Sequence, residues 1–214
     1  MLLRINPHNP QERLLQQAVD ILQNDGILIY PTDTVYALGC DIKSKKALER
    51  ICRIKNIDPE KFTFACICEE VGIVGEYAMQ VSTPVYKLLK SALPGPYTFI
   101  LKASKNIPRH FQSRRKTVGI RVADHKIPTA LVHLLGNPIL TTSLREENEG
   151  LDYPTDPEYI EEKYRKLVDA VIDGGPGGIL PSTVLDCSEG EDKIRLIRTG
   201  LGDLEKLNIV VRDE

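Results

Sequence analysis

Short apolar runs recur along the chain and predict strands. The run at 27–30 is rich in branched side chains and follows Asn24, Asp25 and Gly26, which predicts a buried strand that Pro31 ends. A second apolar segment at 35–38 is predicted to return the chain to the hydrophobic core. Further runs predict strands at 62–68, 97–102, 117–122, 139–142 and 168–172, and a hairpin of 184–186 with 193–197.

Between these runs, apolar residues recur at helical spacing. In the stretch 10–24, Leu14, Ala18, Val19 and Leu22 fall on one helical face before Asn-Asp-Gly ends the pattern. Further helices are predicted at 43–55, 82–93 and 127–135. The stretch 71–80 is ambiguous but favours a helix. An acidic loop with two prolines begins at 146 and leads into a last predicted helix that ends at about 166.

Seven to nine predicted strands with interspersed helices favour an α/β fold. The intervals between strands are irregular, so a mixed, twisted sheet fits better than a purely parallel, doubly wound one. No linker, internal repeat or low-complexity segment divides the sequence, and 214 residues are enough for one sizeable core. We therefore predict a single domain over 1–214, with an open twisted mixed sheet partly covered by helices.

Composition and charge exclude several classes of protein. Hydrophobic residues make up 42% and charged residues 27%, and the net charge of −2 gives no whole-protein attraction to nucleic acid. No apolar stretch is long enough for a membrane span, and the first residues lack a cleavable signal. The five cysteines lack zinc spacing; Cys66 and Cys68 point to one face of a strand, as buried free thiols would. We predict a cytoplasmic protein without a metal site or membrane contact.

Polar residues gather where predicted strands end, at 32–34, 141–143 and 182–183. Such positions often bind ligands in open α/β sheets, although a tight turn explains the first of them equally well. Arg121 lies within an apolar strand, where a charge requires either an anionic ligand or a structural partner. The glycine cluster at 174–178 lacks the Gly-Lys-Ser/Thr of a phosphate-binding loop and is predicted to form a flexible turn.

The classical catalytic sets are missing, since the four histidines are scattered and no nucleophile elbow or zinc motif occurs. Hydroxyls and cations around one sheet instead suit a ligand with carboxylate and phosphate groups. The basic helix 43–55 and the loop 106–116 are either solvated faces or a local patch for nucleic acid. The residues of that candidate RNA patch are Lys43, Lys46, Arg50, Arg53, Arg114, Arg115 and Lys116.

Several motifs together resemble the YrdC-like family. They are Ile-Tyr-Pro-Thr-Asp-Thr-Val-Tyr-Ala-Leu-Gly-Cys-Asp at 29–41, Pro-Gly-Pro-Tyr-Thr at 94–98, Val-Gly-Ile-Arg-Val at 118–122, Asp-Gly-Gly at 173–175, Pro-Ser-Thr-Val at 181–184 and Arg-Thr-Gly at 198–200. The resemblance implies a concave basic sheet face and L-threonylcarbamoyladenylate synthase chemistry. In that reaction threonine, bicarbonate and ATP, which brings Mg²⁺, give threonylcarbamoyl-AMP and pyrophosphate for the modification of tRNA. It also implies binding of double-stranded RNA or tRNA.

The family's site residues carry over position by position. On the threonine side the matches are Thr34, Arg121, Thr141 and Ser182, and on the nucleotide side they are Lys55, Thr117, Ser143 and Arg198. By this resemblance Arg121 pairs with the threonine carboxylate, which would explain a charge within that strand. No side chain is predicted to act as a catalytic nucleophile, in keeping with chemistry that works by positioning and charge neutralisation.

Two departures from the family pattern accompany these matches. The arginine of the family's Lys-x-Arg pair is Ile57 here, and the asparagine of its Ser-x-Asn is Arg145. This pattern resembles the YciO branch, and the chain ends soon after Arg198, without the C-terminal domain of longer members. The sequence leaves open whether the departures weaken the synthase activity, abolish it or change the substrate. An RNA-binding protein of the same fold without efficient catalysis is therefore the alternative.

Overall fold

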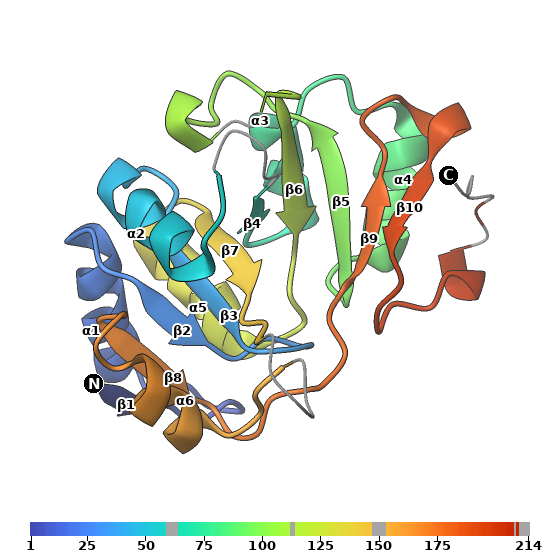
Figure 1. Cartoon of the computed structure of the whole chain (residues 1–214). Helices are drawn as coiled ribbons and strands as arrows, with labels where there is room; N and C mark the ends of the chain where they lie inside the picture. Colours follow the sequence, from blue (N-terminus) through green and yellow to red (C-terminus); the bar gives the residue numbers. More distant parts are fainter. Residues whose placement is uncertain (59–63, 112–113, 147–152, 208, 210–214) are drawn as a thin grey trace.

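The computed structural model describes residues 1–214 except 59–63, 112–113, 147–152, 208 and 210–214. Ten described strands form one sheet in the order β1-β8-β2-β3-β7-β4-β6-β5-β9-β10 (Figure 1). The strands are β1 (Leu2–Arg4), β2 (Leu28–Tyr30), β3 (Ala37–Asp41), β4 (Ala65–Ile67), β5 (Tyr97–Lys102), β6 (Thr117–Arg121), β7 (Ile139–Ser143), β8 (Ala170–Asp173), β9 (Thr183–Asp186) and β10 (Arg195–Arg198).

The predicted mixed sheet is confirmed. Strands β1 and β2 both pair parallel with β8, and β4–β6 and β5–β9 are parallel too, whereas β2–β3, β3–β7, β4–β7, β5–β6 and β9–β10 are antiparallel. The predicted hairpin near the C-terminus is the β9–β10 pair. Strand β1 was not predicted, because three residues are too few to show an alternating pattern. It forms through its parallel pairing with β8.

Six α-helices are described, and local sequence explains their ends. The Ser44 hydroxyl accepts a hydrogen bond from the Ala47 amide at the start of α2, and Gly136 ends α5 with a φ of 72°. No helix in the described residues is long and apolar enough to cross a membrane. The helices are α1 (Glu12–Gln23), α2 (Lys45–Lys55), α3 (Val74–Tyr77), α4 (Thr83–Ala92), α5 (Lys126–Leu135) and α6 (Pro157–Tyr164), with 3₁₀ turns η1 (Val71–Ile73), η2 (Arg109–Phe111), η3 (Glu191–Lys193) and η4 (Glu205–Leu207).

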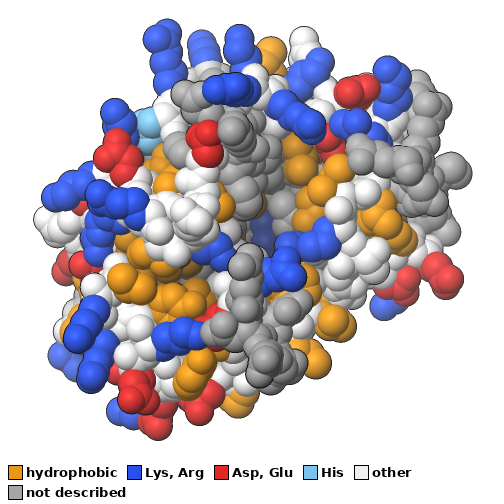
Figure 2. Space-filling view, in the orientation of Figure 1, with side chains coloured by type: hydrophobic (Ala, Val, Ile, Leu, Met, Phe, Trp, Pro, Cys, Tyr) orange, Lys and Arg blue, Asp and Glu red, His pale blue; other side chains and the backbone are white. Residues whose placement is uncertain are grey.

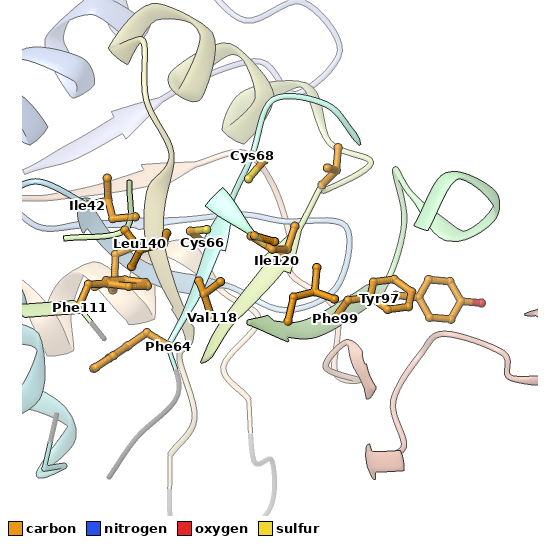
Figure 3. Close-up of a cluster of buried hydrophobic side chains, with 14 of the residues drawn as sticks. Ile42, Phe64, Cys66, Cys68, Tyr97, Phe99, Phe111, Val118, Ile120 and Leu140 are labelled. Carbon is orange, nitrogen blue, oxygen red and sulfur yellow. The ribbon is translucent and has the colours of Figure 1, made fainter. Parts of the chain in front are cut away.

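Two hydrophobic clusters lie on opposite faces of the sheet, because successive side chains of a strand point to opposite sides. The larger cluster joins α2, α4 and α6 to alternate residues of the strands. Its central part is shown in Figure 3, where Cys66, Phe99, Val118, Ile120 and Leu140 meet. Cys66 and Cys68 both belong to this cluster, and all five cysteines are buried free thiols, as predicted.

The smaller cluster is built by α1 and α5, which pack against each other over β1, β8, β2 and part of β3 and β7. These two helices cover only one half of that sheet face. On the other half, the same side of β4, β6 and β5 carries small or polar residues, among them Ala65, Thr98 and Gly119. The uncovered half contains a hollow that five of the eight predicted ligand residues line.

Candidate functional site

A cavity of about 130 Å³ lies over the centre of the sheet, on the half that α1 and α5 leave open. Figure 2 shows this face hollowed near its middle, with Lys and Arg side chains around the hollow. Five of the eight predicted ligand residues line it. The lining residues are Val35, Ala37, Ala65, Thr98, Ile100, Gly119, Arg121, Thr141, Thr142, Ser143, Pro181, Ser182, Val184 and Arg198.

The turn between β2 and β3 presents Thr34 to this site. The Thr32 hydroxyl donates to the Val35 carbonyl oxygen at 2.7 Å and accepts from the Thr34 amide at 3.1 Å. The Thr32 and Thr34 hydroxyl oxygens are 3.1 Å apart. The tight turn that the sequence allowed is therefore present, and the same hydroxyl bonds fix Thr34 beside Arg121.

Arg121 is at the end of β6 and is 6% exposed. Its Nη2 atom donates to Asp33 Oδ1 and to Thr34 Oγ1, both at 2.6 Å. Of the two explanations that the sequence offered for this buried charge, the structural partner is confirmed, since Arg121 pairs with Asp33; the anionic ligand stays a prediction, and Arg121 also lines the cavity. A planar guanidinium in this position can hold a carboxylate through more than one N–H group.

Two other residues matched to the threonine side are held by buried hydroxyl bonds. The Tyr30 hydroxyl donates to Thr141 Oγ1 at 2.9 Å, and burial raises the pKa of Tyr30 well above its ordinary value, which keeps it a donor. Ser182 Oγ lies 2.8 Å from Thr98 Oγ1. Both Thr141 and Ser182 are therefore fixed in orientation at the cavity wall.

The residues matched to the nucleotide side come from four segments. Lys55 Nζ, at the end of α2, donates to the Ser143 carbonyl oxygen at 3.1 Å and to the Arg145 carbonyl oxygen at 3.5 Å. Arg198, in β10, donates from Nη2 to the Ser182 carbonyl oxygen at 2.8 Å. Thr117 is buried on the same face of β6 as Arg121, four residues away at the start of the strand.

Arg198, which lines the cavity, lies within electrostatic reach of two other arginines. Burial lowers the pKa of Arg198, and the positive charges of Arg121 and Arg145 lower it further, whereas Tyr153 opposes the shift. Arg121 and Arg145 are thus close enough to Arg198 for their charges to repel its guanidinium, a cost in free energy that a bound anion would reduce. Arg145, one of the departures from the family pattern, adds its charge to this group.

The other departure, Ile57, has a structural explanation. Its side chain is half-buried and packs against the larger hydrophobic cluster. An arginine at this position would have to leave that contact to reach a phosphate. The charge that the family places at this position is absent, whereas Arg145 places a charge near Arg198.

The glycine cluster at 174–178, predicted to form a flexible turn, packs against the Thr34 segment and Tyr36. The Gly178 amide donates to the Thr34 carbonyl oxygen at 2.8 Å, and a Cβ added to Gly178 would lie 2.2 Å from that oxygen. A Cβ added to Gly177 would lie 2.6 Å from the Tyr36 ring. These glycines allow the turn to approach the Thr34 segment closely.

We expect Gly178→Ala to push the Thr34 segment away and to lower the free energy of unfolding by about 1–3 kcal/mol, as overpacking does. Chemical denaturation measures this change. Gly75→Ala is the matched control, because no atom lies within 4 Å of a Cβ added at Gly75 in α3. Equal stability of the two variants would contradict the close packing at Gly178.

The candidate RNA residues lie in two segments that meet. The His110 ring Nε2 is 3.3 Å from the Ile42 carbonyl oxygen, which brings the loop 106–116 next to the start of α2. Arg50 is engaged inside the protein, since its Nη1 donates to Asp169 Oδ2 at 2.9 Å. The other six candidates, Lys43, Lys46, Arg53, Arg114, Arg115 and Lys116, are exposed.

Three residues of the site were not singled out from the sequence. Asp33 pairs with Arg121, Tyr30 supports Thr141, and Thr98 supports Ser182. All three lie inside the family motifs at 29–41 and 94–98, which was the available signal, although Tyr30 by itself is an ordinary strand residue. The described residues contain no group of three or more His, Cys, Asp or Glu side chains that could hold a metal ion.

Comparison with known proteins agrees with the motifs. A family model, Sua5_yciO_yrdC, described as "Telomere recombination", matches residues 20–200. The chain belongs to the Sua5/YciO/YrdC family. It is 42% identical to YciO of Escherichia coli (strain K12), over 94% of this chain and 96% of YciO. It is also 29% identical to the threonylcarbamoyl-AMP synthase of Pseudoalteromonas translucida, over 81% of this chain and 93% of that protein.

Solved structures of this family share the fold. The crystal structure of E. coli YciO has a TM-score of 0.89 and 39% identity, and the match covers 97% of this chain and 98% of YciO. P. abyssi Sua5, crystallised in complex with L-threonine, has a TM-score of 0.87 and 25% identity, and the match covers all of this chain and 62% of the Sua5 chain. The resemblance that the motifs indicated, including the likeness to YciO, is confirmed.

Proposed function

We propose that this protein binds L-threonine and ATP in the cavity over the sheet and forms threonylcarbamoyl-AMP from threonine, bicarbonate and ATP, releasing pyrophosphate. The observation that carries the proposal is the meeting of Arg121, Thr34 and Arg198 with supported hydroxyls in one hollow. The L-threonine complex of P. abyssi Sua5 supports the choice of amino acid, and the synthase relatives support the reaction.

In this proposal Arg121 binds the threonine carboxylate, while Thr34, Thr141 and Ser182 orient the rest of the amino acid. The half-buried Arg198 and the exposed Arg145 face the phosphates of ATP, whose negative charge offsets the repulsion between their guanidinium groups. Mg²⁺ enters with ATP as part of the substrate. The chain supplies positions and charges, which is what adenylyl transfer requires of a protein without a side-chain nucleophile.

The direct test mixes the protein with ATP, Mg²⁺, bicarbonate and labelled L-threonine and follows threonylcarbamoyl-AMP together with pyrophosphate. We expect both products in equal amounts, and neither when bicarbonate is omitted. Failure to form the product at all would overturn the proposal. A double variant, Ile57→Arg with Arg145→Asn, restores the family pattern, and product from that variant alone would show that the two departures changed the function.

RNA binding is the second candidate, favoured by the contact between the basic loop 106–116 and the start of α2. This contact brings together exposed cations from segments that are far apart in the sequence. Such a cluster neutralises phosphates of either double-stranded RNA or tRNA without reading their sequence. The cavity lined by Arg121 is not needed for this activity, so the two functions can be tested separately.

We expect affinity for a structured RNA to fall as salt rises. The double variant Lys43→Gln with Lys46→Gln should reduce the logarithmic salt slope by about 2, because each lysine–phosphate contact contributes about 1. Filter binding at several salt concentrations measures the slope. The matched control is Lys87→Gln with Lys90→Gln, two exposed lysines on α4. A salt-independent affinity, or equal slopes in both double variants, would rule out this patch.

A further inference from the structure

Two buried polar atoms of the site have no hydrogen-bond partner among the described residues, and both belong to one ion pair. They are Asp33 Oδ2 and Arg121 Nε. The pair itself is made by Arg121 Nη2 and Asp33 Oδ1, 2.6 Å apart. Buried polar atoms in proteins are nearly always paired, so an acceptor and a donor left over side by side require a cause.

The way in which the pair is held explains why one oxygen is left over. Arg121 Nη2 bonds to both Asp33 Oδ1 and Thr34 Oγ1, which turns one corner of the guanidinium toward the turn. Arg121 also lines the cavity. One oxygen of Asp33 therefore bonds to Arg121, whereas its Oδ2 atom and the Nε–H group of Arg121 have no hydrogen-bond partner in the described residues.

No other cation neutralises Asp33 within the described residues. His125, whose ring is close enough for Asp33 to raise its pKa, is affected more strongly by burial, which lowers that pKa. Its Nδ1 atom already accepts a hydrogen bond from the Ile127 amide. His125 is therefore neutral near pH 7, and the Asp33 carboxylate has Arg121 as its one ion-pair partner in the described residues.

We propose that Asp33 recognises the α-ammonium group of the amino-acid ligand, with Oδ2 as its acceptor, while Arg121 binds the carboxylate on the same ligand. An α-amino acid carries a cationic donor and an anionic acceptor on one carbon atom, which matches an unpaired acceptor and an unpaired donor on neighbouring side chains. This assignment rests on the proposed function, and it adds that the site distinguishes an amino acid from a carboxylic acid of the same shape.

The test is a calorimetric titration with L-threonine and with (R)-3-hydroxybutyrate, which has the same skeleton without the ammonium group. We expect the wild-type protein to bind threonine about 10- to 100-fold more tightly, as a lost hydrogen bond to a charged group implies. Asp33→Asn keeps an oxygen for Arg121 but replaces the free acceptor with a donor. We expect this variant to bind both ligands with affinities that differ by less than about 3-fold.

Asp169→Asn is the matched control, because Asp169 also pairs with an arginine, Arg50, but away from the cavity. That variant should keep the full preference for threonine. An unchanged preference in Asp33→Asn would overturn the role of Asp33 and leave the proposed function standing, as would equal affinity of the wild-type protein for both ligands. A wild-type protein that does not bind L-threonine would overturn both. A folded Asp33→Asn protein that binds neither ligand would show that Asp33 only supports Arg121.

Discussion

Arg121→Ala is expected to lower the affinity for L-threonine by at least about 100-fold and to abolish product formation. The guanidinium is almost fully buried and bonds to Thr34, so it is placed to hold a carboxylate there. Under the proposed function, its removal deletes the charge-assisted hydrogen bonds between this guanidinium and the threonine carboxylate. Titration calorimetry gives the affinity, and pyrophosphate release gives the rate.

The same substitution leaves the Asp33 carboxylate buried without its cation, so the free energy of unfolding should fall by about 3–5 kcal/mol. The double variant Arg121→Ala with Asp33→Ala removes both charges, and we expect it to regain most of the stability but none of the threonine binding. Arg50→Ala, which breaks a peripheral pair with Asp169, should leave turnover intact. Threonine binding at wild-type strength in the stable double variant would refute the assignment of Arg121.

Arg198→Ala is expected to reduce kcat/KM for ATP by about 100- to 1,000-fold, as loss of a charge that stabilises a developing phosphate anion does. Threonine affinity should change much less, because Arg121 and Thr34, which bind the threonine carboxylate in this proposal, bond to each other, whereas the bonds of Arg198 go to Ser182. Steady-state pyrophosphate release at varied ATP concentration separates the two effects.

The stability of Arg198→Ala should stay within about 1 kcal/mol of the wild type. The bonds to the Ser182 carbonyl oxygen are lost, but so is the repulsion that Arg121 and Arg145 exert on this half-buried guanidinium. Arg195→Ala on the same strand is the control, because Arg195 pairs with Asp186 and does not line the cavity. A loss of ATP turnover that is equal in both variants would point to general damage of β10 and contradict a specific role for Arg198.

Much of the fold could be read from local pattern. The apolar runs of β5, β6 and β7, the helical spacing in α1 and α5, and the proline and glycine breaks placed most elements within a few residues. Local signals failed where an element is stabilised by remote partners. Strand β1 is an example, because it depends on pairing with β8, almost the whole chain away.

The candidate site divides in the same way. The motifs put Thr34, Arg121, Thr141, Ser182 and Arg198 forward by residue type and order, and the structure brings all of them to one hollow or its edge. The motifs gave no indication that Asp33 forms an ion pair with Arg121 Nη2, that Arg145 adds charge near Arg198, or that Gly178 contacts the Thr34 backbone.

The sequence by itself determined the alternation of strands and helices, the buried charge at Arg121 and membership of the family, because these depend on neighbouring residues and on residue identity. Only the tertiary structure decided which sheet face α1 and α5 leave open and which polar atoms stay unpaired there. Those features arise from contacts between residues about 90 to 150 positions apart, such as Arg121 with Asp33 and Gly178 with Thr34. Packing and desolvation depend on which residues are close in space, and a local sequence pattern does not contain that information.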